Sequence, residues 1–530
     1  MTTQTDTAMT VTGPPRWPSE ADPEIDPGPE AILIAISRDG GVKAYTGKVD
    51  YGQGIRSGFA HAIAEELGVY PSRVDVVMGD TAQVPYDRAT VGSASTRTVG
   101  LQLRRAAASA GQTLREKAAQ KWRVRTEKVV IRGGIAFTPD RPDRSASISQ
   151  LLGDEKLDIQ VRDDVKLKDT DDFRIIGQPL TRTDAVARVT GAAKYTRDIS
   201  LPGMLHGKML RPPSYGAKLL QLDASRAERT PGFVSLVQDG DFVGVVAESE
   251  EAAEYALQAI RSRWEEDRGT ASDWNLPALL KETAGERVTL REEGSLDDGF
   301  RRADHILEGT YFVPYVANAQ MEPSAAVASW DGDYLTVWAA NRAPFQERQN
   351  LAEWLGIGEY RVRVITPEIG GSFGTKTSTA GYEAARLSQA VGRPVRLTYS
   401  REEEFSWSTV RPAALMEVRS GVTEDGEIVA WDYIAYHAGE NAFRGRRGAD
   451  TPYDTGNVRI AVANTESPLR SGSYRSLGGA VNHFARECHM DEIAARLGLD
   501  PLELRLRNLS HPRMRRALTT AADKFGWAER

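Results

Sequence analysis

The spacing of hydrophobic positions predicts an alternation of helices and strands over most of the chain. Ile55, Phe59, Ile63 and Leu67 recur every four residues, which places them on one helix face, and a longer helical pattern covers residues 101–122. Short runs rich in β-branched and aromatic residues predict strands. The predicted strands include 31–36, 42–48, 74–78, 334–338, 360–365, 393–399, 417–422 and 428–436, with further helices at 345–354, 378–391 and 517–527. The pattern is typical of an α+β protein with several domains.

Charged and proline-rich stretches divide this pattern into blocks. The first residues are rich in proline and acidic side chains, which predicts a disordered or surface-draped arm. Two charged stretches with few aromatic residues are typical of linkers. The block between them alternates strands and turns and ends in a predicted helix from the N-cap Ser249 to Trp264. The predicted order is an arm, an N-terminal block, a linker, a second block, a linker and a final block: 1–28, 29–150, 151–175, 176–265, 266–300 and 301–530.

A glycine-rich loop at residues 367–377 joins a predicted strand to a predicted helix. Its glycines, Gly370, Gly371 and Gly374, let the backbone approach a ligand closely, and the helix start offers free N–H groups to a phosphate or an oxyanion. An ordinary strand-to-helix turn would have the same composition. A Walker A loop is excluded because Thr375 separates Gly374 from Lys376, and the glycines lack dinucleotide-fold spacing.

Three further loops of small residues also precede predicted helices. They comprise Gly52-Gln53-Gly54, the stretch from Gly92 to Thr96, and residues 470–479. Four such loops offer far more exposed backbone than one phosphate requires. A phosphate-binding α/β enzyme would use only one of them.

Composition narrows the possible chemistry. The 530 residues are 40% hydrophobic and 27% charged with a net charge of -7, so no excess of basic residues indicates nucleic acid. No apolar run reaches membrane-span length, and the N-terminus lacks a signal-peptide pattern, which favours a cytoplasmic protein. The lone cysteine, Cys488, is best interpreted as a core residue, and one cysteine cannot form a disulfide framework or ligate an iron–sulfur cluster. His483 and His489 do not share a helix face well, so any metal must come with a cofactor that carries its own ligands.

Taken together, the four loops resemble motifs of the molybdenum-binding subunits of the xanthine dehydrogenase and aldehyde oxidase family. The resemblance is strongest to the bacterial type that includes nicotinate dehydrogenase and isoquinoline oxidoreductase large subunits. The loop Gly370–Gly374 is similar to G-G-x-F-G, Tyr474–Gly479 to F-R-G-F-G-G, Gly52–Gly54 to M-G-Q-G, and Gly92–Ser95 to A-S-x-S. Residues 176–265 resemble the hammerhead domain of that family, followed by the molybdenum-cofactor-binding domain.

The resemblance implies a molybdenum–molybdopterin cytosine dinucleotide cofactor, with no iron–sulfur cluster in this chain and no metal ligand from the protein. It implies that Gln53 and nearby amides hold the pterin, and that Phe373 and Arg475 lie beside the metal through their backbones. The implied cofactor-binding residues are Gly52, Gln53, Gly54, Gly92, Ser93, Ala94, Ser95, Gly371, Ser372, Phe373, Gly374 and Arg475. The implied substrate pocket contains Asn341, Thr377, Tyr474 and Leu477.

Several positions depart from the family pattern. Thr377 replaces a glutamate that meets purines, Asn341 replaces a glutamine, and Leu477 replaces an aromatic residue. A smaller and less acidic pocket argues against purines and leaves another N-heterocycle or an aldehyde as substrate. The active loop also lacks the cysteine of a carbon monoxide dehydrogenase.

The family's C-terminal G-x-G-E segment, which carries the catalytic base, has no counterpart at the end of this chain. The similar string Gly356–Glu359 is best interpreted as a turn that closes a helix, and Glu368 as a loop or cap residue. We therefore expect the general-base glutamate to come from outside these residues, either from a separate polypeptide or from a further C-terminal domain.

Two functional hypotheses follow from the resemblance. In the first, the chain is a subunit of a molybdenum hydroxylase that takes a small-molecule substrate and passes electrons to a [2Fe-2S] subunit. In the second, it is an inactive paralogue or an assembly scaffold. In either case we expect the N-terminal loops at 49–54 and 92–96 to meet 370–374 and 474–479 in space.

Overall fold

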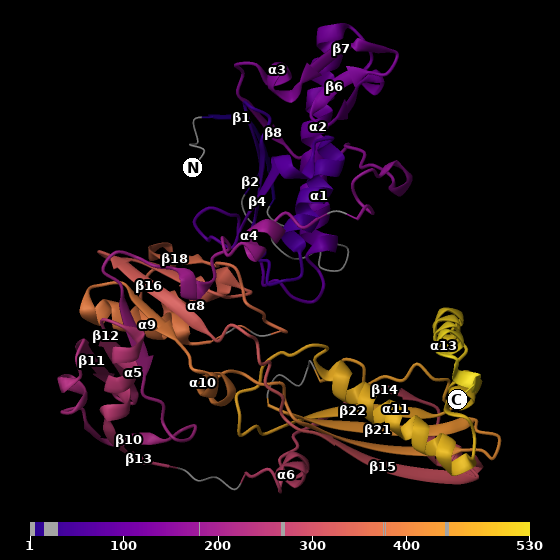
Figure 1. The fold of residues 1–530 in the computed structure, drawn as a ribbon. Coiled ribbons are helices and arrows are strands. Elements are labelled where there is room, and N and C mark those ends of the chain that lie inside the picture. The colour runs from indigo at the N-terminus through magenta and orange to yellow at the C-terminus, as the bar shows by residue number, and fades with distance from the viewer. Residues whose placement is uncertain are drawn as a thin grey trace.

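The computed structural model describes residues 6–14, 30–179, 181–266, 271–374, 376, 378–439 and 445–529. Helices and strands are mixed throughout and gather around three main sheets, as the predicted α+β class requires. Figure 1 shows the N-terminal block at the top, a second sheet with strands β9 to β19 below it on the left, and a third sheet with strands β14 to β22 at the lower right, with the C-terminal helix at the far end of the third sheet.

The first sheet forms the N-terminal block. Its strand order is β4-β3-β2-β1-β8, with the outermost pairs parallel and the inner pairs antiparallel. The helices α1 and α2 bury their apolar faces against it, with Phe59, Ile63 and Leu114 in the shared core. The strands are Thr7–Gly13 (β1), Ala31–Ser37 (β2), Val42–Thr46 (β3), Val74–Met78 (β4) and Leu157–Gln160 (β8), and the helices are Ile55–Leu67 (α1) and Leu101–Trp122 (α2).

A small antiparallel sheet extends this block. It contains Val130–Arg132 (β5), Ile135–Thr138 (β6) and Arg141–Ser147 (β7), followed by the helix Ile148–Leu152 (α3). A capping box between Ser147 and Gln150 starts that helix.

The second sheet has seven strands in the order β11-β12-β9-β19-β16-β17-β18. Three strands come from the second block and four from the final block, joined by the parallel pair β9 and β19. The strands are Leu205–Met209 (β9), Phe233–Asp239 (β11), Phe242–Ala247 (β12), Ala325–Asp331 (β16), Tyr334–Ala339 (β17), Val362–Ile365 (β18) and Val395–Thr398 (β19). The helices that pack on it are Glu250–Ala259 (α5), Pro344–Leu355 (α8) and Ala380–Val391 (α9), and the same part of the chain also contains Ala185–Val189 (α4) and Arg401–Ser406 (α10).

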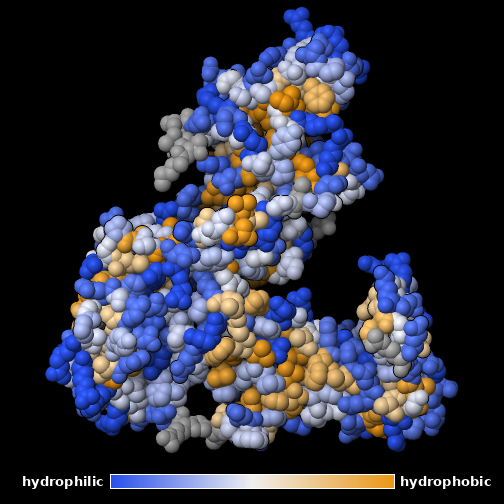
Figure 2. All heavy atoms as spheres, viewed as in Figure 1, coloured by the Kyte–Doolittle hydropathy of each residue, from blue (hydrophilic) through white to orange (hydrophobic). Residues whose placement is uncertain are grey.

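The third sheet has the order β14-β22-β21-β20-β15 and carries the long helix α11 on one face. Its strands are Arg287–Glu293 (β14), His305–Val313 (β15), Ala414–Val422 (β20), Ile428–Ala438 (β21) and Val458–Thr465 (β22). The helices are Leu276–Glu282 (α6), Leu296–Arg302 (α7), Gly478–Leu497 (α11), Pro501–Arg507 (α12) and Pro512–Phe525 (α13). In Figure 2 apolar side chains gather on the surface beside α11 and along α13.

Three segments that were predicted to be an arm or a linker contain regular secondary structure. In the predicted arm, residues 7–13 form the buried strand β1, whose backbone pairs with β2 on one side and β8 on the other. Residues 15–29 of the predicted arm lie outside the described part. The predicted linker 151–175 contains β8, which pairs with β1. The predicted linker 266–300 contains α6, α7 and β14, and the sequence of β14 is polar because most of its side chains are exposed.

The helix predicted to reach Trp264 is also shorter. Ser249 is its N-cap, since its hydroxyl accepts a hydrogen bond from the Ala252 amide at 3.1 Å. The helix ends at Ala259, and Trp264 lies on the strand Arg261–Glu265 (β13), which pairs with Lys218–Asp223 (β10). The β-sheet pairing therefore overrides the helical pattern there.

Candidate cofactor site

The loop before α1 is built around the carboxylate of Asp50, which is fully buried. Its two oxygens accept hydrogen bonds from the amides of Gly52 at 2.9 Å, Gly54 at 3.3 Å and Arg56 at 3.1 Å. Gly52 and Gly54 have φ angles of 111° and 79°, which favour glycine. Nothing lies within 4 Å of the position that a Gly52 Cβ would occupy, so this backbone is open to a ligand.

The side chain of Gln53 folds back onto its own loop. Its Oε1 accepts a hydrogen bond from the Tyr51 amide at 2.8 Å, and its Nε2 donates to the Val49 carbonyl at 3.1 Å. Gly52 and Gln53 are both exposed, and the Gln53 amide is held to its own loop by these two bonds.

The second loop continues from the first through Thr90. The Thr90 hydroxyl accepts a hydrogen bond from the Val49 amide at 3.0 Å, and its carbonyl accepts one from the Tyr51 hydroxyl at 2.8 Å. Gly92 and Ser93 are exposed with φ angles of 69° and 54°. Ala94 and the buried Ser95 lead into a π-helical turn, Thr96–Gly100, and then into α2. This loop also exposes backbone at a helix start.

The third loop needs its glycines for packing. A Cβ at Gly370 would lie 2.3 Å from the Glu322 Cβ, and one at Gly374 would lie 3.2 Å from the Tyr474 backbone. The Glu322 carboxylate accepts a hydrogen bond from the Gly370 amide at 2.8 Å. Phe373 has a φ angle of 51° and a side chain that is 42% exposed, so this aromatic ring faces outward from a strained turn.

The fourth loop lies directly against the third. The Arg475 guanidinium stands 5.3 Å from the centroid of the Phe373 ring. Asn318 donates from one side-chain nitrogen to both the Ser372 carbonyl at 3.1 Å and the Ser473 carbonyl at 3.3 Å. The buried Asn318 thus anchors the third loop to the fourth.

Arg342 joins the N-terminal loops to the third loop. Its carbonyl accepts a hydrogen bond from the Thr90 amide at 2.9 Å, and its guanidinium donates to the Gly374 carbonyl. Arg342 therefore joins the N-terminal block, beside the second loop, to the third loop, while the direct meeting of 49–54 and 92–96 with 370–374 and 474–479 stays a prediction. The binding of a cofactor by individual residues of these loops stays a prediction.

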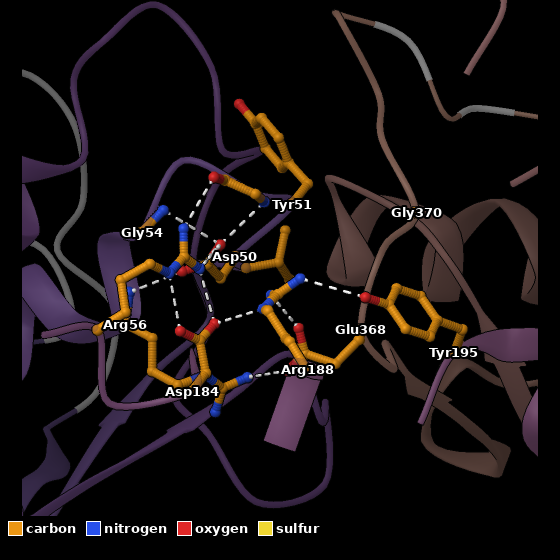
Figure 3. A network of polar contacts seen from close by, with 12 residues as sticks. Asp50, Tyr51, Gly54, Arg56, Asp184, Arg188, Tyr195, Glu368 and Gly370 are labelled. Atoms are coloured by element: carbon orange, nitrogen blue, oxygen red, sulfur yellow. Dashed lines mark hydrogen bonds and ion pairs between the residues drawn. The ribbon is translucent and has the colours of Figure 1, made fainter. Parts of the chain in front are cut away.

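A network of arginines and carboxylates braces the same junction (Figure 3). The Glu368 carboxylate pairs with Arg56 at 3.3 Å and with Arg188. Arg188 and Arg182 both bind Asp184, at 2.8 and 2.7 Å, and they hold the pKa of that carboxyl well below its usual range. Arg182 in turn donates to the Gly52 carbonyl at 3.0 Å. Glu368 therefore ties the third loop to the first, and both its oxygens are engaged by cations.

Asn341 is buried and turned toward its own helix. Its Oδ1 accepts a hydrogen bond from the Ala343 amide at 2.6 Å, and its Nδ2 donates to Glu347 at 3.0 Å. Both residues border a pocket of about 200 Å³ that Trp407 and Arg470 also line. Burial raises the pKa of Glu347 to about 7, although the bond from Asn341 opposes this.

The structure describes only some of the other residues predicted to line the substrate pocket. Leu477, with a φ of 54°, donates its amide to the Tyr474 carbonyl at 2.8 Å before α11 begins. Thr377 lies outside the described residues. Within the described ranges no group of three or more His, Cys, Asp or Glu residues could hold a metal ion. The same ranges contain no helix with the length and apolar character needed to cross a bilayer.

Sequence reasoning missed Asp50, Asn318, Arg342 and the arginines of the network. Asp50 could have been found, because an aspartate two residues before a glycine often accepts a hydrogen bond from that glycine's amide in a tight turn. Arg342 could not, because only the fold brings it to Gly374.

Family models and relatives agree with this geometry. Two models described as molybdopterin cofactor-binding domains match residues 280–509 and 8–193. The chain is 32% identical over 525 residues to one of the nicotinate dehydrogenase subunits of Pseudomonas putida, covering 94% of this chain and 44% of that protein. It is 26% identical to the beta subunit of isoquinoline 1-oxidoreductase from Brevundimonas diminuta, covering 97% of this chain and 74% of that protein.

Solved structures show the same likeness. Quinoline 2-oxidoreductase from Pseudomonas putida 86 superposes with a TM-score of 0.56 at 25% identity, over 64% of this chain and 50% of that one. The chain spans less than half the length of the nicotinate dehydrogenase polypeptide that it matches. With both cofactor-binding domain models matched and the loops linked through Thr90, Arg342 and Asn318, the chain belongs to the family of molybdopterin-binding subunits of the xanthine dehydrogenases and aldehyde oxidases.

Proposed function

We propose that the chain is the molybdopterin-binding part of a molybdenum hydroxylase that acts on an N-heterocycle or an aldehyde. The observation that carries this proposal is the joining of four backbone-exposing loops, drawn from both matched domains, through Thr90, Arg342 and Asn318. A long anionic dinucleotide suits such loops, because amides at helix starts and small hydroxyls bind phosphate and pterin oxygens.

The open backbone fits the cofactor named by the family. No atom lies within 4 Å of the Cβ positions of Gly52 and Gly92, so a pterin or a dinucleotide could approach the backbone there without obstruction. When bound, the molybdenum–molybdopterin cytosine dinucleotide would supply the two-electron oxidation chemistry. The chain's own part is to hold the cofactor and to place Phe373 and Arg475 at its reactive end.

Cofactor content tests this proposal. The chain is produced in a host that makes molybdopterin cytosine dinucleotide, and molybdenum and CMP released by acid are measured per protein. We expect near-stoichiometric molybdenum and CMP, and a loss of both in Gly374→Val, because the new side chain meets the Tyr474 backbone. Gly332→Val is the control, since Gly332 also has a positive φ but stands in a turn with nothing within 4 Å. A well-folded chain without molybdenum would contradict the proposal.

We also propose a partner that carries electrons away. Hydroxylation delivers two electrons, and the single cysteine of the sequence cannot ligate a [2Fe-2S] cluster. The names of several relatives designate subunits, which supports an assembly. Turnover by the purified chain with a one-electron acceptor and no added protein would contradict this. A cytoplasmic location stays a prediction.

The general base is proposed to lie outside these residues. Among the described carboxylates near the loops, Glu368 is held by two arginines and Glu322 by the Gly370 amide and Lys376. Neither is free to take a proton from a metal-bound ligand. A further polypeptide segment would supply the base, and it would also cover the exposed apolar side chains of Phe484, Phe525 and Trp527.

A second function, that of an inactive paralogue or scaffold, is favoured by the same engagement of Glu368 and by the inward turn of Asn341. The two hypotheses differ in what the loaded assembly does. A scaffold would bind no molybdenum, or would bind it and still give no hydroxylation when every partner is present.

A further inference from the structure

A second cavity lies in the N-terminal block, and none of the four site loops lines it. It has a volume of about 680 Å³, within the range of roughly 300–1,000 Å³ that is usual for small-ligand pockets. Its walls are the end of α1, one face of α2, the strand β5 and the segment 168–178.

Most of the lining is apolar. Leu67, Val69 and Ile131 form the inner wall, and Ile175 closes the side formed by the 168–178 segment. At the rim stands Tyr70, which is 64% exposed and packs its ring against Gly133. These side chains would accept an aromatic or aliphatic body.

The buried acidic groups of the cavity wall are already engaged. Glu66 binds Arg104 at 2.8 Å and also accepts from the Lys168 amide. Glu65 binds the Lys168 ammonium at 2.9 Å and accepts the amides of residues 174–176 at 2.6 to 3.1 Å. These carboxylates therefore hold the 168–178 segment in place.

Arg115 on α2 is a charged group of the wall, which also carries Glu127, Arg132, Asp172 and Arg174, and its side-chain hydrogen bond goes to a neutral amide. Its guanidinium donates to Gln112 Oε1 at 2.8 Å and forms no ion pair with any carboxylate in the described part of the chain. Burial lowers the pKa of Arg115, although the charges of Glu116 and Glu66 oppose this. Glu116 itself is paired with Arg162 at 2.8 Å. A partly buried cation whose neighbouring carboxylates are paired with other cations is stabilised by an anionic ligand.

We propose that this cavity binds a small organic carboxylate, with its charged end on Arg115 and its apolar body against Ile131, Ile175 and Tyr70. The planar guanidinium offers two parallel N–H groups to a carboxylate, which a hydroxyl or an amide would match less well. The site is separate from the cofactor loops, so its binding does not depend on molybdenum.

Equilibrium binding to the full chain tests this proposal. The probe is 4-phenylbutyrate, and the uncharged 4-phenylbutan-1-ol is compared by calorimetry at the same pH and salt concentration. We expect the carboxylate to bind and the alcohol to bind at least about tenfold more weakly, because a charge-assisted hydrogen bond is lost. Arg115→Gln should weaken 4-phenylbutyrate by a similar factor and leave the alcohol unchanged.

A matched control and a second variant complete the design. Arg125→Gln removes an exposed arginine close in sequence that does not line the cavity, and it should bind like the unaltered chain. Tyr70→Ala should weaken both ligands, because it removes part of the apolar wall without touching the charge. Equal affinity for acid and alcohol, or an Arg115→Gln chain that binds the acid as Arg125→Gln does, would overturn the proposal, as would no binding at millimolar concentrations.

Discussion

Removing the charge of Glu368 should loosen the junction between the N-terminal and final blocks. The Glu368 side chain is 16% exposed and its partners Arg56 and Arg188 are 29% and 22% exposed, so the pairs lie between surface and buried cases. Exposed pairs contribute about 0–1 kcal/mol and the breaking of buried ones costs about 3–5 kcal/mol. Because solvent screens the partly exposed arginines, Glu368→Gln should destabilise the folded chain by about 2 kcal/mol, between these two limits.

A double-mutant cycle measures this coupling. The unfolding free energy is determined in urea for Glu368→Gln, Arg188→Met and the double variant, and the molybdenum content is measured in parallel. We expect a coupling energy of about 1–2 kcal/mol and a lower molybdenum content, because Arg188 and Glu368 brace the loop that carries Gly52. The control is Glu359→Gln. The Glu359 side chain pairs with Arg348 but is 45% exposed, so this variant should change the free energy of unfolding by less than about 1 kcal/mol.

Two outcomes would refute this account of Glu368. A coupling energy near zero would show that the network does not brace the junction. Unchanged stability and molybdenum content with complete loss of hydroxylation would show that Glu368 is the base, and that the proposal of an external base is wrong.

Three further predictions concern stability. Burial lowers the pKa of His437 and His489 to about 4, below the pKa of a histidine in the unfolded chain. The free energy of unfolding should therefore be highest above about pH 6.5 and fall by about 2 kcal/mol per histidine by pH 5, which urea unfolding at pH 7.5 and pH 5 checks. Burial raises the pKa of Glu347 to about 7, so the buried carboxylate destabilises the fold not at all below about pH 4.5 and fully above pH 7. Glu347→Gln should therefore raise the free energy of unfolding by about 2 kcal/mol at pH 8 and by almost nothing at pH 4.5. Ser249→Ala should cost about 1 kcal/mol, measured by thermal unfolding, because the Ala252 amide loses its cap; a smaller loss for Ser225→Ala, at a turn, is the control.

Local signals in the sequence carried much of the fold. The helices Ile55–Leu67 and Leu101–Trp122 were predictable, because their apolar stripes pack against one sheet and nothing competes with them. The strand β1 was not, because its threonines look like a polar arm until β2 and β8 pair with it. Likewise Trp264 needed its partner strand β10 before a strand could be distinguished from a helix end.

The site was predictable in its loops but not in its connections. Glycines at 52, 54, 371 and 374 marked the places where the backbone adopts positive φ. The side-chain roles were set by contacts far apart in sequence, such as Arg342 with Gly374 and Arg182 with Gly52. Asn341 was expected to face a substrate, but the start of α8 and Glu347 take both ends of its amide.

The seven-stranded sheet limits how the chain can be divided. Leu205, His206 and Gly207 on β9 pair in parallel with Val395, Arg396 and Leu397 on β19, almost two hundred residues later. A fragment cut out as residues 176–265 would leave the β9 ladder as a bare edge, and the remainder would expose β19 in the same way. Unpaired strands of this kind recruit other chains, so both fragments should aggregate, although each covers a complete block of the sequence. Because β14 and β15 of the third sheet lie between β9 and β19 in the sequence, engineering by domain exchange should keep the second and third sheets together.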